Sequence, residues 1–447
     1  MPSPTLVNSV TTGVETAAAR ALRWGFGQAL PQFAMRTAAR RGDLHGRLVL
    51  ASNGPDMPLE LFEEIRAAGA MHRSKFAMVT ASLPVVKEVL NSHDVRSGVD
   101  FNGTGAVGTL QSWAFDRAPL GPLTPPSLLV TEPPEHTRYR KLVTRVFSVR
   151  AVQRLRGRTE EIAASLLDDL AARADSPVDL VHDYCALLPV TVIAEILGVP
   201  LSERDRVLGF GMAAAPSLDL GLTWRRFRRV DQALLGFDQW LGEHLASVRR
   251  NPGDDLLSQM VLARDYDGNG LSDNELKSTA GLVLAAGFET TVNLLSNGIA
   301  LLMQNPDQLR RLQAEPDLWP NAVDEVLRVD PPVLLTGRTV VRDTEVAGQP
   351  VPRGAIITTL LAAANRDPEV FTEPNRFDVT RENAAEHVAF SSGRHYCLGA
   401  ALARMEGEVG LRTIFDRFPE LQLLEGAERR STRILRGWEV LPASLKA

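Results

Sequence analysis

The stretch Phe390-Ser-Ser-Gly-Arg-His-Tyr-Cys397-Leu-Gly399 holds the strongest signal in the sequence. Gly393 allows the backbone a tight turn that other residues adopt only with strain. The residues from Ala400 to about Phe415 are expected to form a helix that begins directly after Gly399. Such a helix directs its positive end and its free N–H groups toward the Cys397 sulfur. These donors lower the pKa of a thiol, so the pattern predicts a cysteine held as a thiolate.

A cysteine thiolate is a soft, charged ligand that binds haem iron and pushes electron density toward bound oxygen. In this interpretation Gly399 lets the backbone approach the haem, and Phe390 packs beside the ligand and shields it. The alternative for any single cysteine is burial in the core. Cys397 has Phe390, two glycines and His395 at fixed spacings, which favours the iron ligand. Cys185 lies in an apolar helical stretch without such a motif, and we expect it to pack in the core.

The spacing Phe-x-x-Gly-x-x-x-Cys-x-Gly resembles the haem-binding signature of cytochromes P450. The bacterial form commonly reads Phe-Gly-x-Gly-x-His-x-Cys-Leu-Gly, and this chain departs from it at Ser391, where glycine is usual. The resemblance implies haem b with Cys397 as the iron ligand. It also implies a mainly α fold with small β-sheets, shaped as a triangular prism, with one long central helix over the haem.

Residues 272–304 form that long helical pattern. Ser272 and Glu275 make a capping box at its start, and Asn305-Pro306 ends it. A membrane span is the wrong interpretation, because polar residues such as Glu289 interrupt the apolar run.

Within this helix lies Ala286-Gly287-Phe288-Glu289-Thr290-Thr291. Threonine can bond back to a carbonyl one turn earlier and bend a helix. Gly287 removes a side chain that would block a small ligand. The hexapeptide resembles the cytochrome P450 pattern Ala-Gly-x-(Asp/Glu)-Thr, which implies that Glu289 relays protons, that Thr290 orients them, and that Ala286 lies beside the haem. The alternative is an ordinary polar stripe on a buried helix.

Glu325 and Arg328 lie one turn apart in a partly apolar helix. By itself this spacing is weak evidence. The resemblance adds a second arginine from a loop, matched here by Arg376, and implies a buried network that supports the haem site structurally.

Haem propionates need cations. By the resemblance, four residues match the propionate-binding positions of the family: His136, Arg140, Arg338 and His395. The alternative for each alone is a solvated charge.

Composition bounds the remaining possibilities. The formal net charge of −5 gives no support to a strongly basic nucleic-acid binder. Two cysteines in 447 residues argue for a reducing compartment. No signal peptide and no apolar stretch of about 18 residues is visible, so we expect a cytoplasmic protein without a transmembrane segment. The resemblance spans about residues 45–447 as one domain, preceded by a helical extension at 1–44.

Residues 11–41 interleave aromatic side chains with arginines. They are expected to form a surface helix docked on the core, or alternatively an interfacial membrane helix with a basic face. Further along, strands are expected at 47–51, 77–80, 338–341, 344–346 and 355–360, an irregular loop at 95–128, and a hairpin at 431–441.

The leading hypothesis is a monooxygenase that inserts one atom of dioxygen into a lipophilic substrate. The resemblance implies electrons from NAD(P)H through a separate ferredoxin and ferredoxin reductase. The expected ferredoxin-docking face is basic, although a merely solvated face is the alternative, and it comprises Arg138, Lys141, Arg145, Arg150, Arg394 and Arg404. Two other hypotheses are a peroxide-driven peroxygenase and a non-catalytic haem or ligand-binding protein.

Overall fold

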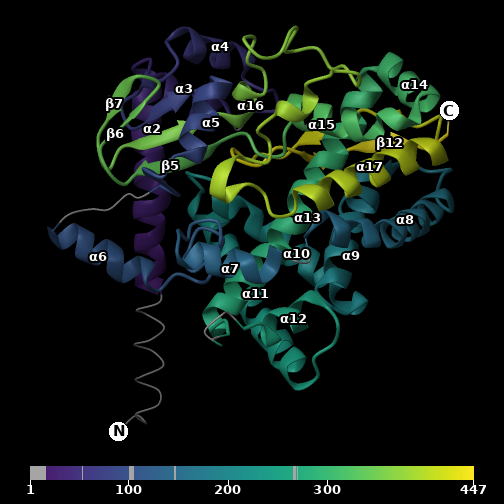
Figure 1. Cartoon of the computed structure of the whole chain (residues 1–447), viewed down its shortest axis with the longest axis horizontal. Helices are drawn as coiled ribbons and strands as arrows, with labels where there is room; N and C mark the ends of the chain where they lie inside the picture. The colour runs from purple at the N-terminus through teal and green to yellow at the C-terminus, as the bar shows by residue number, and fades with distance from the viewer. Residues whose placement is uncertain are drawn as a thin grey trace.

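A computed structural model of the chain describes residues 17–52, 54–99, 105–144, 147–264, 268 and 270–446. The expected mainly α fold with small sheets is confirmed (Figure 1). The α-helices are α2 (Leu30–Arg40), α3 (Leu44–Ala51), α4 (Leu59–Ala67), α5 (Leu83–Asn91), α6 (Gly105–Phe115), α7 (Glu135–Thr144), α8 (Val149–Ala171), α9 (Leu187–Ile196), α10 (Arg204–Ala214), α11 (Trp224–Arg250), α12 (Leu256–Leu262), α13 (Asp273–Gln304), α14 (Pro306–Ala314), α15 (Trp319–Val329), α16 (Leu361–Ala364) and α17 (Ala400–Arg417).

The strands are short. They are β1 (His72–Arg73), β2 (Met78–Thr80), β3 (Val95–Ser97), β4 (Val178–Asp179), β5 (Thr336–Val340), β6 (Thr344–Val346), β7 (Gln349–Val351), β8 (Ile356–Thr359), β9 (Gln422–Leu423), β10 (Glu428–Arg429), β11 (Trp438–Val440) and β12 (Pro442–Ser444). The largest sheet has the order β1-β2-β8-β5-β3, with β2 and β8 parallel and the other pairs antiparallel. Smaller sheets have the orders β4-β12-β9, β10-β11 and β6-β7.

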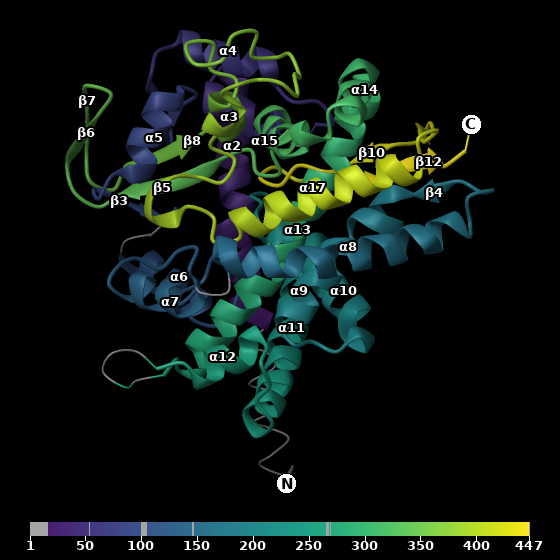
Figure 2. The ribbon, with the colours of Figure 1, turned by 45° about the vertical axis from the view of Figure 1, so that its right-hand side comes forward.

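Helix α13 runs through the centre of the molecule and contacts α9, α11 and α17 (Figure 2). Its start carries the expected capping box, in which the Ser272 and Glu275 side chains each accept a backbone N–H. The expected helix after Gly399 is also present as α17, which lies along α8 as well as α13. No helix among the described residues is long and apolar enough to cross a bilayer.

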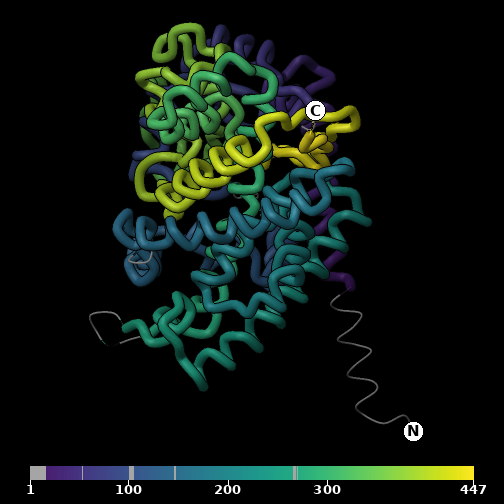
Figure 3. Tube along the Cα trace, turned by 90° about the vertical axis from the view of Figure 1, so that its right-hand side faces the viewer, coloured from purple at the N-terminus to yellow at the C-terminus, as the bar shows by residue number. Residues whose placement is uncertain are grey.

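Helix α17, near the yellow end of the colour range, crosses the middle of the molecule, with green and purple segments on one side and the blue and teal helices on the other (Figure 3). The largest apolar core is built mostly from α8, α9, α13, α15 and α17, and it includes Cys185 as expected. One contact in this core is very close. A Cβ built on Gly211 of α10 would lie 1.9 Å from the ring of Phe288 on α13, so only glycine fits there.

Two sequence-based expectations are wrong. Residues 47–51 belong to helix α3 rather than to a strand. Asp43 caps this helix by accepting the Gly46 N–H, and Gly46 lets α3 pack directly on the backbone of α2. The region 95–128 is not all irregular, because it contains β3 and the 11-residue helix α6. Between Gly105 and Phe115 there is no proline, so a helix forms between the glycine- and proline-rich flanks.

The other strand expectations agree with the structure to within one or two residues. A hairpin is present near the expected one at 431–441, but its first strand, β10, lies before that range, and residues 430–437 form the turn. The N-terminal segment is helical from residue 17 to Arg40, passing through a π-helical stretch, Gly25–Ala29, before α2. We call residues 17–40 the N-terminal helix.

Candidate active site

The loop before α17 holds Cys397 in a constrained backbone. Gly393 has φ +68°, and a Cβ added there would lie 2.4 Å from the Leu90 carbonyl oxygen. Ser391 also adopts a left-handed conformation, with φ +65°. The Cys397 N–H donates to the Phe390 carbonyl at 2.9 Å, which closes the loop. A Cβ built on Gly399 would meet no protein atom within 4 Å, so this glycine leaves open space beside the cysteine.

The surroundings of Cys397 combine access with a dense protein environment. Its side chain is accessible, yet burial raises the pKa of the thiol, opposed by the Gly399 N–H and by Arg140 and Arg404. The Cys397 side chain is therefore open to a ligand although protein atoms lie close around it. The expected helix N–H donor is present, but in the protein alone burial outweighs it. Phe390 packs nearby under the Arg404 guanidinium, 4.6 Å from its ring centre.

Three of the four expected propionate-binding residues have no carboxylate partner among the described residues. Arg338 on β5 is buried and bonds only its neighbours Thr336 and Gly337, and burial lowers its pKa to about 10. Arg140 on α7 donates to the Tyr396 carbonyl, next to Cys397, and burial lowers its pKa. His136 is also buried, and its Nε2 has no hydrogen-bond partner in the part of the chain that the structure describes.

Buried cations and unpartnered polar atoms are costly unless an anion or acceptor joins them. Burial, followed by the neighbouring His395 and Arg140, lowers the pKa of His136 to about 4. Together, Arg140, Arg338 and His136 form an arrangement that fits the carboxylates of a haem beside an accessible cysteine.

The fourth expected residue, His395, binds the carboxylate of Glu132, which was not among the expected site residues. Its Nε2 lies 3.0 Å from Glu132 Oε1, and its ring centre lies 4.6 Å from that of His136. Glu132 also accepts the Ser97 N–H and pairs with Arg394. Although burial opposes it, these bonds lower the pKa of Glu132 to about 2. Its partners lie far away in the sequence, so no local pattern could have identified it.

On α13, Ala286 and Thr290 lie one turn apart and remain accessible within a largely buried helix. The Thr290 hydroxyl donates to the Ala286 carbonyl at 3.1 Å, the back-bonding expected for this motif. The role expected for Gly287 is wrong. A Cβ there would lie 3.0 Å from Ile193 of α9, so Gly287 serves helix packing rather than leaving room for a ligand.

Glu289 is buried and forms an ion pair with Arg430, which follows β10. Its Oε2 has no hydrogen-bond partner among the described residues. Burial raises the pKa of Glu289, and Arg430 opposes this rise. Sequence reasoning missed Arg430, because 141 residues separate it from Glu289. The site therefore holds an acid that keeps its proton more readily than an exposed glutamate does.

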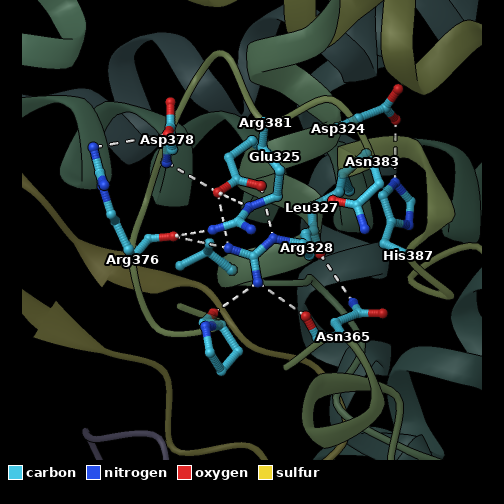
Figure 4. Close-up of polar contacts among 12 residues, drawn as sticks. Asp324, Glu325, Leu327, Arg328, Asn365, Arg376, Asp378, Arg381, Asn383 and His387 are labelled. Carbon is cyan, nitrogen blue, oxygen red and sulfur yellow. Dashed lines mark hydrogen bonds and ion pairs between the residues drawn. The ribbon is translucent and has the colours of Figure 1, made fainter. Parts of the chain in front are cut away.

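The buried support network contains Glu325 and Arg328 as expected (Figure 4). Arg328 donates from Nε and Nη2 to the two carboxylate oxygens, at 2.7 and 2.8 Å. The second arginine is Arg381, whose Nε lies 3.2 Å from Glu325 Oε1. The expectation of Arg376 is wrong. Its side chain is exposed and pairs with Glu373 and Asp378.

Arg376 contributes to the network only through its main-chain carbonyl. That oxygen accepts from both Arg328 and Arg381 (Figure 4). The turn that carries this carbonyl inward points the Arg376 side chain outward, and the next arginine along the chain supplies the charge.

Several members of the expected docking face bind inside the protein instead. Arg138 pairs with Glu275, Arg394 with Glu132, and Arg404 with Asp324. Lys141 and Arg150 are exposed, and within the described ranges neither has an ion-pair partner. Arg145 lies outside the described residues.

Comparisons with known proteins agree with this geometry. The family model "Cytochrome P450" matches residues 212–437. The chain is 50% identical over 411 residues to cytochrome P450 140 of Mycobacterium tuberculosis, covering 91% of this chain and 93% of that protein. It is 40% identical over 332 residues to vitamin D(3) 25-hydroxylase of Pseudonocardia autotrophica, covering 72% and 79%.

Among solved structures, P450BioI in complex with hexadec-9Z-enoic acid ligated acyl carrier protein is similar, with a TM-score of 0.77 and 27% identity, covering 86% of this chain and 98% of that one. The family indicated by the cysteine motif is thus confirmed. The chain belongs to the cytochrome P450 family of haem-containing enzymes, and it is a cytochrome P450 monooxygenase.

Proposed function

We propose that the chain binds haem b through Cys397 and inserts one atom of dioxygen into a lipophilic substrate. The observation that carries the proposal is the accessible Cys397 beside Arg140, with Arg338 and His136 lacking carboxylate partners among the described residues. These side chains would hold the iron and the propionates, while Phe390 shields the sulfur. When bound, haem supplies the activation of dioxygen and the oxidising power.

The chain's own part in the reaction is to place a proton. Thr290 presents its hydroxyl on the accessible face of α13, oriented by the Ala286 carbonyl. The Glu289 carboxyl lies behind this face, with one oxygen paired to Arg430 and the other unpartnered in the described structure, and burial raises its pKa. We assign Glu289 as the proton source and Thr290 as the group that orients the proton. A peroxygenase has no need of such a relay, which is why this alternative ranks second.

Apolar segments support a lipophilic substrate. The residues near 208–224, at 333–336 and at 434–435 are largely apolar, and Val333 pairs with Leu435. Two similar proteins carry names or titles with lipophilic compounds, vitamin D(3) and hexadec-9Z-enoic acid. We propose a compound of this general character as substrate.

The decisive experiment is spectroscopic. The purified protein, reduced and exposed to carbon monoxide, is expected to show the long-wavelength absorbance band of sulfur-ligated haem, and Cys397→Ala is expected to abolish it. Folded wild-type protein without this band contradicts the proposal. Turnover of lipophilic compounds with NADPH, ferredoxin and ferredoxin reductase then separates a monooxygenase from a peroxide-driven enzyme and from a ligand-binding protein.

We propose that ferredoxin docks over the exposed Lys141 and Arg150. Charge reversal of a rim cation slows association and reduces its dependence on salt. The double variant Lys141→Glu/Arg150→Glu is expected to slow reduction at low ionic strength. Charge reversal at Arg412, on the exposed side of α17, is the matched control. An unchanged rate in the double variant contradicts this docking face.

We propose a cytoplasmic location with peripheral contact to lipid. On the outward face of α2, Leu30 and Phe33 are 57% and 71% exposed, and the exposed Arg36 and Arg40 follow on the same helix. Apolar and basic residues together suit an anionic membrane surface. Sedimentation with anionic vesicles tests this, and Phe33→Asp is expected to reduce binding. If the wild-type protein does not sediment with the vesicles, the proposed contact with lipid is wrong.

A further inference from the structure

The N-terminal helix crosses segments that lie far apart in the sequence. Arg23 is 5% exposed, and its guanidinium joins two of these segments. It donates to the Arg117 carbonyl at 2.9 Å, just after α6, and to Asp231 on α11 at 2.6 Å. Arg20 binds the second oxygen of Asp231. One buried cation therefore links the end of α6 to α11.

One helical turn further on, Gln28 binds the turn that precedes α11. Its Oε1 accepts the N–H groups of Gly221 and Leu222, at 2.6 and 2.9 Å, and its Nε2 donates to the Asp219 carbonyl. The Trp24 indole donates to the Leu222 carbonyl at 2.8 Å. Side chains of the N-terminal helix thus hold the turn at 219–222, in addition to the backbone bond from the Asp219 N–H to the Pro216 carbonyl.

The same turn contacts the C-terminal turn, whose residues 434–435 belong to the proposed substrate pocket. The Asp219 carboxylate accepts the N–H groups of Arg433 and Ile434, at 2.9 and 3.2 Å. Ile434 in turn accepts the Leu334 N–H, on the segment that leads into β5. This C-terminal turn, residues 430–437, also carries Arg430, the partner of Glu289 on α13. Hydrogen bonds, together with the backbone of the 430–437 turn, therefore connect Gln28 to α13.

We infer that Arg23 and Gln28 are positioning residues, whose hydrogen bonds hold the 219–222 turn and the end of α6 over the proposed substrate pocket. We call these hydrogen bonds the latch. Bulky substrates enter the pocket only when the latch opens. The inference rests on the proposed substrate site. Both residues lie far from the cysteine loop in the sequence, and neither contacts Cys397 or the expected propionate-binding residues. Weakening the latch is therefore expected to change passage into the pocket while leaving iron ligation intact.

The test compares two iron ligands of different size. Imidazole is small enough to pass without the latch opening, whereas clotrimazole is bulky. In holoenzyme carrying Arg23→Ala, stopped-flow association of clotrimazole is expected to be about tenfold faster, because a buried hydrogen bond to a charged group is lost. Association of imidazole is expected to remain unchanged. Arg40→Ala is the matched control, because Arg40 lies on the same helix, is exposed and has no partner in the described structure.

Gln28→Ala provides a second variant in case Arg23→Ala fails to fold, since it removes only neutral hydrogen bonds. Amide hydrogen exchange at residues 219–222 is expected to accelerate in this variant, together with clotrimazole association. Faster exchange with unchanged clotrimazole kinetics would make the contact purely structural and overturn the inference. Equal acceleration for both ligands would also overturn it. Absence of the carbon monoxide band from folded wild-type protein, by contrast, would contradict the proposed function and not the latch.

Discussion

Two buried glutamates of this molecule, Glu325 and Glu289, differ in how completely arginine side chains satisfy them. Glu325 accepts four hydrogen bonds, from Arg328 twice, from Arg381 and from the Asp378 N–H. Glu289 pairs with Arg430 alone, and its Oε2 is left without a partner among the described residues. A fully satisfied buried charge is rigid, whereas a partly satisfied one stays costly and open to change of protonation. The difference separates a structural acid from one suited to moving a proton.

The largest expected effect concerns the satisfied acid. Glu325→Ala leaves Arg328 buried without a carboxylate, and breaking a buried pair in this way costs about 3–5 kcal/mol. We expect the variant to lose most of its folded, haem-loaded fraction, measured by urea unfolding and by the carbon monoxide band. Glu373→Ala, which removes an exposed partner of Arg376, is the control. A stable Glu325→Ala protein that binds haem normally would contradict the structural role of Glu325.

Glu289, the partly satisfied acid, is expected to matter for turnover rather than for stability. Loss of a positioned proton donor typically slows a reaction by about 10²-fold or more. Glu289→Gln is therefore expected to reduce product formation by about this factor. Its melting temperature is expected to stay close to that of the wild type, because the glutamine carbonyl can still accept from Arg430, which also bonds Trp438 and lies near Glu439.

The raised pKa of Glu289 also makes the stability of the fold depend on pH. Because the folded state holds this proton more tightly than the unfolded state, its contribution to stability is full below pH 4.5 and is lost as pH rises through the folded pKa. Glu289→Gln is expected to remove this loss. Glu439→Gln, at a half-exposed neighbour of Arg430, is the control for turnover. Equal turnover in both variants would contradict the assigned role.

Glu132 provides an intermediate case with the opposite sign. Its pKa is lowered from 4.5 to about 2, so its stabilising contribution is present above pH 4.5 and is lost as pH falls toward 2. Glu132→Gln is expected to lower the melting temperature at pH 7. The difference between variant and wild type is expected to shrink as the solution is acidified below pH 4.5. A difference that is constant with pH would show that packing, not charge, is what Glu132 supplies.

The smallest effects distinguish two arginines. Arg381 is nearly buried and binds Glu325, so Arg381→Ala is expected to cost about 1–3 kcal/mol. Arg376 has an exposed side chain, so Arg376→Ala is expected to cost less than about 0.5 kcal/mol. Urea unfolding of both variants measures the difference. If Arg376→Ala cost more than Arg381→Ala, Arg376 would be the second arginine of the network, as the resemblance implied.

Features encoded locally were predictable from the sequence. The capping box placed the start of α13, and Gly399 placed the start of α17, because helix ends depend on a few adjacent residues. Residues 47–51 were mistaken for a strand because the run of four apolar residues at 48–51 does not reveal a helical or a strand period. The capping residue of α3, Asp43, also binds Ser74 and Lys75, and those contacts belong to tertiary structure.

Partners in the site escaped prediction when they came from distant parts of the chain. Arg430 and Glu132 bind residues 141 and 263 positions away, and neither lies in a motif. The choice between Arg376 and Arg381 depended on which way a turn directs its side chains, and spacing alone does not specify that. Gly287 was assigned to the ligand for a similar reason, because its close neighbour Ile193 lies on another helix.

The close fit between Gly211 and Phe288 has a mechanical consequence. Phe288 directly precedes Glu289, and its ring touches the backbone of α10 with no intervening side chain to absorb a displacement. A displacement of α10 would therefore be transmitted through the Phe288 ring to the turn of α13 that bears Glu289, without any direct contact between α10 and the Glu289 carboxyl.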